Sequence, residues 1–396
     1  MKLWNPSTDT DRLIEQYTVG SDYETDLLLV PYDCRASIAH ARMLGGIGIL
    51  DAAEVEQLIQ GLEEIIALAE RGEFSIAPEQ EDCHTAIEQY LTENIGEAGE
   101  KIHTGRSRND QVLTALRLLY KDSIDDIADT ADSLISIMES FDSEFGTVKV
   151  PGYTHTRKAM PSSMGMWITA YRDGVSDDLK LLGNARSLIN QSPLGTGAGY
   201  GTPLELDRQC TSQELGFERI QENPVYAQHS RGKFDLLILQ TCVQIMYDMN
   251  RMASDLILFS MPQFGFFRLP EKFCTGSSIM PQKRNPDVLE LVRSKYHTIC
   301  GYESQLQSQS ANLISGYHRD LQLGKEPVIQ GLQITLGTLE VMARVVGGLE
   351  VDTERCAEEL TEELYATERA YDLVREGVPF REAYRRISGE FREKKP

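Results

Sequence analysis

Apolar residues between positions 106 and 145 recur in alternating steps of four and three. This spacing places them on one side of a helix, as in the seam of a helix bundle. The stretch contains neither proline nor glycine, so one helix of up to 40 residues is expected. Four aspartates lie off the seam and are expected to face solvent. The seam residues are Tyr120, Ile124, Ile127, Ala131, Leu134, Met138 and Phe141, and the aspartates are Asp125, Asp126, Asp129 and Asp132.

A second stretch, residues 234–260, carries apolar residues around the whole circumference of a helix. Such a helix is expected to be buried at the centre of a bundle. Proline is also absent from residues 79–150, 225–261, 287–326 and 328–378, which indicates further long helices. No run of alternating β-branched residues reaches beyond a short hairpin, so the fold is expected to be mainly α.

The predicted organisation has three parts. An N-terminal helical domain is expected over residues 1–105, a central long-helix bundle over 106–351, and a small C-terminal helical segment over 352–396. A chain of 396 residues is long enough for two or three domains of ordinary size. No internal repeat or low-complexity segment is evident.

The chain is strongly acidic, with 61 acidic against 39 basic residues and a formal net charge of −22. This charge opposes tight binding to nucleic acid or to an anionic membrane, so neither is expected as a partner. Plain solubility is the favoured reason for the charge, and a saline cytoplasm is the alternative. The seven cysteines include no CxxC pair, and no window is apolar enough to cross a membrane. A reduced, cytoplasmic protein is expected.

Three polar, irregular segments between long helices contain residue types that are expected to form one functional site. The first, residues 103–111, places Arg106 and Arg108 beside backbone N–H groups at the start of the long helix, which suits a carboxylate ligand. A capping loop with solvated arginines is the alternative. The second segment, residues 151–155, ends in His155. Histidine is the commonest proton carrier near neutral pH, although a lone histidine is more often structural.

A helix is expected to begin near Pro161, after the second segment. The third segment, residues 275–287, combines small residues, Lys283, Arg284 and two prolines. Such a loop can close over a ligand, and its cations can stabilise developing negative charge. A surface turn can have the same composition, so only the exact sequence of the segment distinguishes a ligand-binding loop from a surface turn.

The sequence of this segment, GSSIMPQKRNPD, resembles the signature GSSxMPxKxNP of the fumarase/aspartase superfamily. The segment HTGRSRNDQV resembles the HTARSRNDQV of argininosuccinate lyases, whereas fumarases and aspartases carry a segment like GTxTNMNxNE there. Matching segments run from YDCRASIAHARML near the start to VPFREAYRRI at 378–387, so the resemblance covers essentially the whole chain. The glycines of PLGTGAGYG lack the context of a nucleotide loop; in the family they form a structural turn near the site.

The resemblance implies β-elimination of argininosuccinate to fumarate and arginine, the last step of arginine biosynthesis, without metal or organic cofactor. By resemblance, Ser277 is the base, and Lys283 and Asn285 stabilise the aci-carboxylate intermediate. His155 is the acid toward the leaving guanidinium, and Glu290 orients its ring. The substrate contacts implied by the family pattern are Asp26, Asp82, His84, Arg108, Asn109, Thr154, Tyr317, Gln322 and Lys325.

The resemblance also implies a homotetramer, in which five long helices per chain form a twenty-helix core and each active site draws on three chains. The chain departs from the family pattern in places. The usual THLQxAQP reads THTRKAMP, with Arg157 and Met160 in place of glutamines. His318 replaces an asparagine, and the usual DKE has become Gly324-Lys325-Glu326. These departures leave the amine half of the substrate open, and the chain is shorter than usual in its C-terminal part.

Three other interpretations remain to be weighed. A lyase for a related or modified succinyl-amine is the nearest, although the SRND segment argues against adenylosuccinate. A non-catalytic structural homologue is disfavoured because Ser277, His155, Lys283 and Glu290 are all present. A di-metal bundle would need paired Glu-x-x-His motifs on facing helices, and none is found.

Overall fold

The computed structural model describes residues 11–393, and helices dominate this part of the chain. Its contacts divide the chain into two compact units. Within the described residues, unit 1 comprises 11–126, 182–241 and 301–333, and unit 2 comprises 127–181, 242–300 and 334–393. These boundaries fall inside long helices, so the division at residues 105 and 351 stays a prediction. Residues 1–10 of the predicted N-terminal domain and residues 394–396 of the predicted C-terminal segment lie outside the described residues.

The predicted long helix is α7 (Arg108–Phe145), which runs for 38 residues. Reciprocal hydrogen bonds fix its start. Ser107 Oγ accepts from the N–H of Asn109 at 3.2 Å, and Asp110 Oδ1 accepts from the N–H of Ser107 at 2.8 Å. These bonds satisfy backbone groups that a helix N-terminus leaves without intrahelical partners. The prediction of one helix is confirmed, with a start two residues later than position 106.

The seam of α7 is buried as its spacing predicts. All seven seam residues are buried, and the most exposed of them, Phe141, is only 5% exposed. The four off-seam aspartates are exposed, as predicted. Burying an apolar side chain of this size contributes about 1.5–3 kcal/mol, so packing along the seam, more than helix propensity, stabilises α7.

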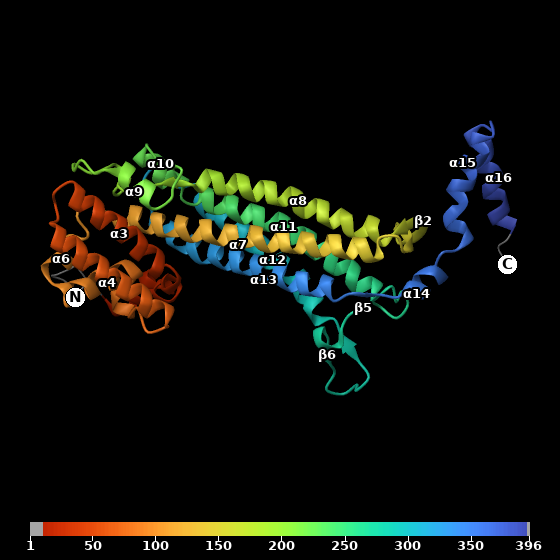
Figure 1. Cartoon of the computed structure of the whole chain (residues 1–396), viewed down its shortest axis with the longest axis horizontal. Helices are drawn as coiled ribbons and strands as arrows, with labels where there is room; N and C mark the ends of the chain where they lie inside the picture. Colours follow the sequence, from red (N-terminus) through yellow and green to blue (C-terminus); the bar gives the residue numbers. More distant parts are fainter. Residues whose placement is uncertain (1–10, 394–396) are drawn as a thin grey trace. The chain divides into compact units, whose positions relative to one another are not determined.

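Long helices also form most of unit 2, where their segments lie side by side (Figure 1). The rings of Phe141 and Trp167 lie 6.2 Å apart, and Trp167 Nε1 donates to Asp255 at 3.0 Å. The rings of Tyr247 and Tyr296 lie 6.0 Å apart. These contacts join α7 to α8, α8 to α11, and α11 to α12. The helices are α8 (Met164–Ile189), α11 (Lys233–Phe259), α12 (Asp287–Ser310) and α13 (Lys325–Gly347).

Helix α11 is buried over most of its circumference, as its composition predicts. Its core residues Ile238, Leu239 and Met246 have no exposed surface. One stripe is nevertheless exposed in the single chain, including Tyr247 at 44% and Leu258 at 40%. Gln240, Gln244 and Arg251 are the other exposed residues of this stripe.

The shorter helices of unit 1 begin at recognisable caps. Asp51 accepts from the N–H of Glu54 at 2.9 Å, and Glu54 in turn accepts from the N–H of Asp51 at 3.0 Å, which starts α4 (Ala52–Glu70). Gly61 of α4 allows α5 (Cys83–Ile95) to approach closely. The remaining elements are α1 (Arg12–Val19), α2 (Asp22–Thr25), η1 (Asp26–Leu28), α3 (Val30–Gly46), η2 (Pro78–Gln80), α6 (Glu97–Lys101), β3 (Gln191–Ser192), α9 (Arg208–Glu214), β4 (Arg219–Ile220), α10 (Pro224–Ser230) and η4 (Arg319–Gly324).

Unit 2 also holds an antiparallel hairpin of β1 (Lys149–Thr154) and β2 (Arg157–Ser163). Pro161 pairs with Pro151 inside it, and α8 begins at Met164. The helix predicted to begin near Pro161 is therefore confirmed, with a start three residues later, because strand pairing extends to Ser163. None of the helices in the described residues is long and apolar enough to span a bilayer. The other elements are β5 (Phe267–Arg268), η3 (Glu271–Phe273), β6 (Thr275–Gly276), β7 (Arg284–Asn285), β8 (Glu350–Val351), α14 (Thr353–Glu358), η5 (Glu362–Tyr365), α15 (Ala366–Arg375) and α16 (Phe380–Glu393).

Candidate active site

A polar pocket of about 180 Å³ lies in unit 1. Its wall comes from the N-terminal helices, the start of α5, the start of α7, and residues 317–325. It brings together eight residues that the sequence singled out as substrate contacts: Asp26, Asp82, His84, Arg108, Asn109, Tyr317, Gln322 and Lys325. Asp22, Glu81, Val112, Arg231 and Arg319 also line it.

The ammonium group of Lys325 is buried among carboxylates. Its side chain is 4% exposed, and its Nζ contacts Asp26 and lies 3.2 Å from Asp22 Oδ1. Burial alone would lower the pKa of Lys325, but Asp26 and Asp22 outweigh it and raise the pKa. Lys325 is therefore a fixed positive charge in the pocket wall. Asp26 also accepts from the N–H of Cys83 at 3.2 Å, which ties η1 to the start of α5.

His84 is oriented by a buried carboxylate. Its Nδ1 lies 2.9 Å from Asp33 Oδ2, and Gln111 Nε2 donates to both oxygens of Asp33 at 3.0 Å. Burial lowers the pKa of His84, but the charge of Asp33 outweighs it and raises the pKa. The ring therefore favours the charged form, with an N–H on each nitrogen. Its Nε2 is buried and has no hydrogen-bond partner among the described residues.

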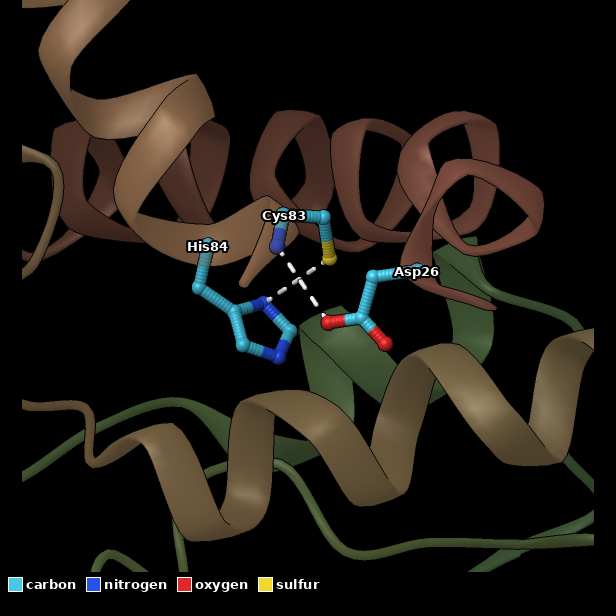
Figure 2. A group of neighbouring side chains, drawn as sticks. All are labelled: Asp26, Cys83 and His84. Carbon is cyan, nitrogen blue, oxygen red and sulfur yellow. Dashed lines mark hydrogen bonds between the residues drawn. The ribbon is translucent and has the colours of Figure 1, made fainter. Parts of the chain in front are cut away.

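Asp26, Cys83 and His84 place their ligand-type atoms within 4.8 Å of one another (Figure 2). Cys83 Sγ lies 3.6 Å from His84 Nδ1, the nitrogen that also faces Asp33. Burial raises the pKa of the Cys83 thiol well above its usual range, and the ammonium of Lys325 contacts Asp26. A protonated thiol and an adjacent cation both oppose metal binding. The donor set therefore fits a hydrogen-bonded cluster better than a metal centre.

Asp82 has a structural task besides the predicted substrate contact. It caps α5 by accepting from the N–H of Thr85 at 2.8 Å, and it lies 3.3 Å from Arg108 Nη1. Arg108 also donates to Thr85 Oγ1 at 2.7 Å. The Arg108 side chain remains 30% exposed. The guanidinium is thus held by the protein on one side and open to a ligand carboxylate on the other.

The SRND segment is joined to the glycine-rich turn by Asp110. Its Oδ2 accepts from the N–H groups of Gly195 and Gly197, each at 2.9 Å. Both glycines have positive φ, at 86° and 58°, which the turn requires. Burial raises the pKa of Asp110 to about 6, although these backbone donors oppose the rise. Asp110 thereby holds the loop that presents Arg108 and Asn109.

The other predicted residues belong to unit 2, where Thr154 and His155 lie at the tip of the β1–β2 hairpin. Thr154 pairs with Arg157, leaving His155 and Thr156 as the two turn residues. Their φ values of 51° and 58° are both left-handed, as a two-residue hairpin turn requires. Neither residue is glycine or asparagine, so the turn carries backbone strain. Thr154 and His155 are both exposed.

Ser277 and Lys283 lie in the loop between β6 and β7, and Asn285 lies in β7. Ser277 Oγ accepts from the N–H of Met280 at 3.1 Å, and Asn285 Nδ2 donates to Gly276 O at 3.4 Å. Lys283 is exposed. Glu290 is exposed as well, in the first turn of α12. Within the described residues of one chain, no hydrogen bond or ion pair joins His155 to Glu290, or Lys283 to Ser277.

Several residues of the site were not predicted from sequence. Asp33 and Asp110 lie inside quoted motifs, YDCRASIAHARML and HTGRSRNDQV, so a signal was present. Their partners are 51 and 85 positions away, however, which local spacing does not reveal. Arg319 likewise lies in the matching segment YHRDLQ, at 317–322, whereas Arg231 and Asp22 line the pocket without any such signal.

Comparison with known proteins gives consistent matches. A family model described as "Lyase" matches residues 6–301. The argininosuccinate lyase of Thermotoga neapolitana is 50% identical over 394 residues, covering 100% of this chain and 99% of the relative. The argininosuccinate lyase of Sorangium cellulosum is 45% identical, covering 98% and 90%. The length of this chain is therefore shared with the Thermotoga relative.

Solved structures share the fold. A fumarate lyase:delta crystallin from Brucella melitensis, bound to cobalt, has a TM-score of 0.79 at 20% identity, covering 93% of this chain and 85% of the other. A class II fumarase from Schistosoma mansoni also has a TM-score of 0.79, at 18% identity, covering 94% and 91%. These likenesses confirm the predicted long-helix architecture.

Proposed function

The chain belongs to the argininosuccinate lyase family, and from this premise we propose that it cleaves argininosuccinate by β-elimination to fumarate and arginine. The observation that carries the proposal is the 50% identity to a curated relative over the full length of both chains. The polar pocket of unit 1 supports it, because its fixed cations suit the carboxylates of a succinyl group.

The reaction requires a base, a charge-stabilising group and an acid. In the proposed mechanism Ser277 takes the proton from the carbon next to a carboxylate. Lys283 favours the deprotonated serine by its charge, and Lys283 and Asn285 stabilise the doubly charged aci-carboxylate that forms. Support comes from the placement of Ser277, Lys283 and Asn285 on one β6–β7 loop and strand.

When the intermediate collapses, the bond between carbon and nitrogen breaks and the leaving nitrogen takes a proton. We assign this proton to His155, whose exposed position at a hairpin tip leaves its ring accessible to a ligand. Glu290 is the proposed partner that fixes the tautomer of the ring. Products are fumarate and arginine, with no redox change.

The succinyl carboxylates are assigned to Arg108, Asn109 and Thr154. His84 supports this assignment, because its buried Nε2 has no partner among the described residues and favours an anionic acceptor. Tyr317, Gln322 and Lys325 are assigned to the rest of the substrate, with Asp26 and Asp82 holding Lys325 and Arg108 in place.

We also propose a homotetramer whose active sites combine loops of different chains, as the family resemblance implies. The exposed stripe of α11 supports it, since Tyr247 and Leu258 are large side chains on an otherwise buried helix. A cytoplasmic location is proposed with it, because arginine synthesis needs no export.

The test is fumarate release, followed by ultraviolet absorbance, from argininosuccinate, adenylosuccinate and aspartate in separate assays. Fumarate from argininosuccinate alone is the expected result. Fumarate from neither argininosuccinate nor the other two would contradict the proposal and favour a modified succinyl-amine, for which Arg157, Met160 and His318 are the first residues to examine.

A further inference from the structure

Four carboxylates line the pocket of unit 1, and three of them have several fixed partners. Asp26 holds Lys325 and accepts from the N–H of Cys83. Asp82 caps α5 and pairs with Arg108. Glu81 lies 2.6 Å from Arg319 Nη2 and 3.8 Å from Arg108 Nη1. Their charges are therefore already matched within the protein.

Asp22, the fourth carboxylate, is in a different position. Its one ion pair among the described residues is with Lys325, at 3.2 Å, and that ammonium also contacts Asp26. The Asp22 side chain is 20% exposed, against 1% for Asp26. One ammonium thus serves two carboxylates, and Asp22 is the one that a ligand can reach.

Asp22 also lies where the pocket meets a larger cavity of about 700 Å³. Asp22, Arg319 and Gln322 line both spaces. The second cavity has an acidic lining, with Asp320 and Glu326 as its other charged residues. A substrate whose succinyl half occupies the first pocket can therefore extend past Asp22 into an acidic space that favours a cation.

The sequence supplies an independent observation. The family pattern DKE has an acid at the position of Gly324, immediately before Lys325. Gly324 is buried at the end of η4, and a Cβ there would lie 2.9 Å from Leu306 Cδ2. This chain therefore has no carboxylate at 324, and Asp22, from the N-terminal segment, is the carboxylate that shares Lys325 with Asp26.

We infer that Asp22 binds the cationic amino-acid half of the substrate and is a specificity-determining residue. The inference rests on the proposed function and deepens it. Burial raises the pKa of Asp22 to about 6, with Lys325 opposing and Asp26 adding to the rise. A bound guanidinium or ammonium supplies the missing positive charge and so favours the ionised carboxylate.

The test is the reverse reaction of the full-length protein, in which fumarate and arginine are varied separately. Asp22→Asn is expected to raise the KM for arginine about 10–100-fold, as for loss of a charged hydrogen bond, and to change the KM for fumarate less than about twofold. Glu24→Gln is the matched control, because Glu24 lies on the same short helix, is exposed and lines neither cavity. It should leave both constants unchanged.

The KM for fumarate reports whether the part of the site that binds the succinyl half is intact, and the Tm of the variant reports whether it is folded. Asp22→Ser repeats the comparison with a smaller side chain. An unchanged KM for arginine, or an equal rise for both substrates, would overturn the role of Asp22 while leaving the proposed function intact. If the wild-type protein does not join fumarate to arginine at all, the proposed function fails first, and the role of Asp22 fails with it.

Discussion

Lys158 and Glu359 form a double contact: Nζ of Lys158 lies 2.7 Å from Oε2 of Glu359 and donates to its backbone oxygen at 2.7 Å. Lys158 is the fifth residue of the THTRKAM segment, three positions after His155. Glu359 follows α14 and is also held by Arg355 at 2.6 Å. The hairpin that carries the proposed acid at its tip is therefore anchored, within unit 2, to the C-terminal segment.

Removing this anchor should affect turnover more than binding. Lys158→Ala is expected to lower kcat about 3–30-fold, because small displacements of a proton donor are costly, while KM changes less than about twofold. Lys158→Arg, which can keep the ion pair, should retain most activity. Lys149→Ala, at an exposed position of β1, is the control. Steady-state kinetics at several pH values measure the effect; unchanged kcat in Lys158→Ala would contradict the anchoring role.

Loss of the proposed base or acid should be far more severe. Ser277→Ala and His155→Asn are each expected to lower kcat at least about 1000-fold, since each removes a group that transfers a proton. Size-exclusion chromatography should show an unchanged oligomer. The neighbouring Ser278→Ala is the control and should stay within a few-fold of wild type. Near-normal turnover in Ser277→Ala would exclude Ser277 as the base.

The long helices were predictable because their signals are local. The 4–3 spacing from Tyr120 to Phe141 and the absence of proline are enough to place α7. The hairpin was harder, since Pro161 suggests a helix start and only pairing with Pro151 shows a strand. Proline can occupy an edge strand, where its missing N–H costs no ladder hydrogen bond.

The candidate site was predictable in its residues but not in their connections. Sequence motifs placed His84 and Arg108 in the site. The structure adds that Asp33 orients His84 and that Asp82 orients Arg108. These partners come from segments distant in sequence or serve as helix caps. Asp22 gave no sequence signal, because its significance depends on the cavity beside it.

Asp178 is expected to make stability depend on pH. It is 7% exposed, and its Oδ2 has no hydrogen-bond partner in the part of the chain described. Burial and then the charges of Asp248 and Asp177 raise its pKa to about 7, above an unfolded value near 3.8. Because the pKa of Asp178 is higher in the folded state than in the unfolded state, its protonated form favours folding at low pH. This stabilisation is lost as the pH rises through about 7.

Asp178→Asn should remove that loss, because the amide stays neutral at every pH. Its Tm is expected to exceed that of wild type by a few degrees at pH 8, and the two values should converge at pH 4–5. This difference corresponds to a loss of about 1–3 kcal/mol in the free energy of unfolding when Asp178 ionises. Asp132→Asn, at an exposed off-seam position of α7 and without influence on the Asp178 pKa, is the control. Parallel Tm curves for Asp178→Asn and wild type would show that Asp178 is not the titrating group. Differential scanning fluorimetry across this pH range measures both.

The turn that presents His155 should become more stable when its strain is relieved. Thr156 has φ 58°, a conformation that costs a β-branched residue roughly 1–2 kcal/mol and costs glycine little. Thr156→Gly loses the hydrogen bond from Thr156 Oγ1 to His155 O and raises the entropy of the unfolded chain. Both effects oppose folding, so the net gain in stability is expected to be only about 0.5–1 kcal/mol. Tm should rise by about 1–3 °C, whereas Ser162→Gly, in extended strand β2, should lower it. A lower Tm for Thr156→Gly would mean that the turn is held by the threonine side chain.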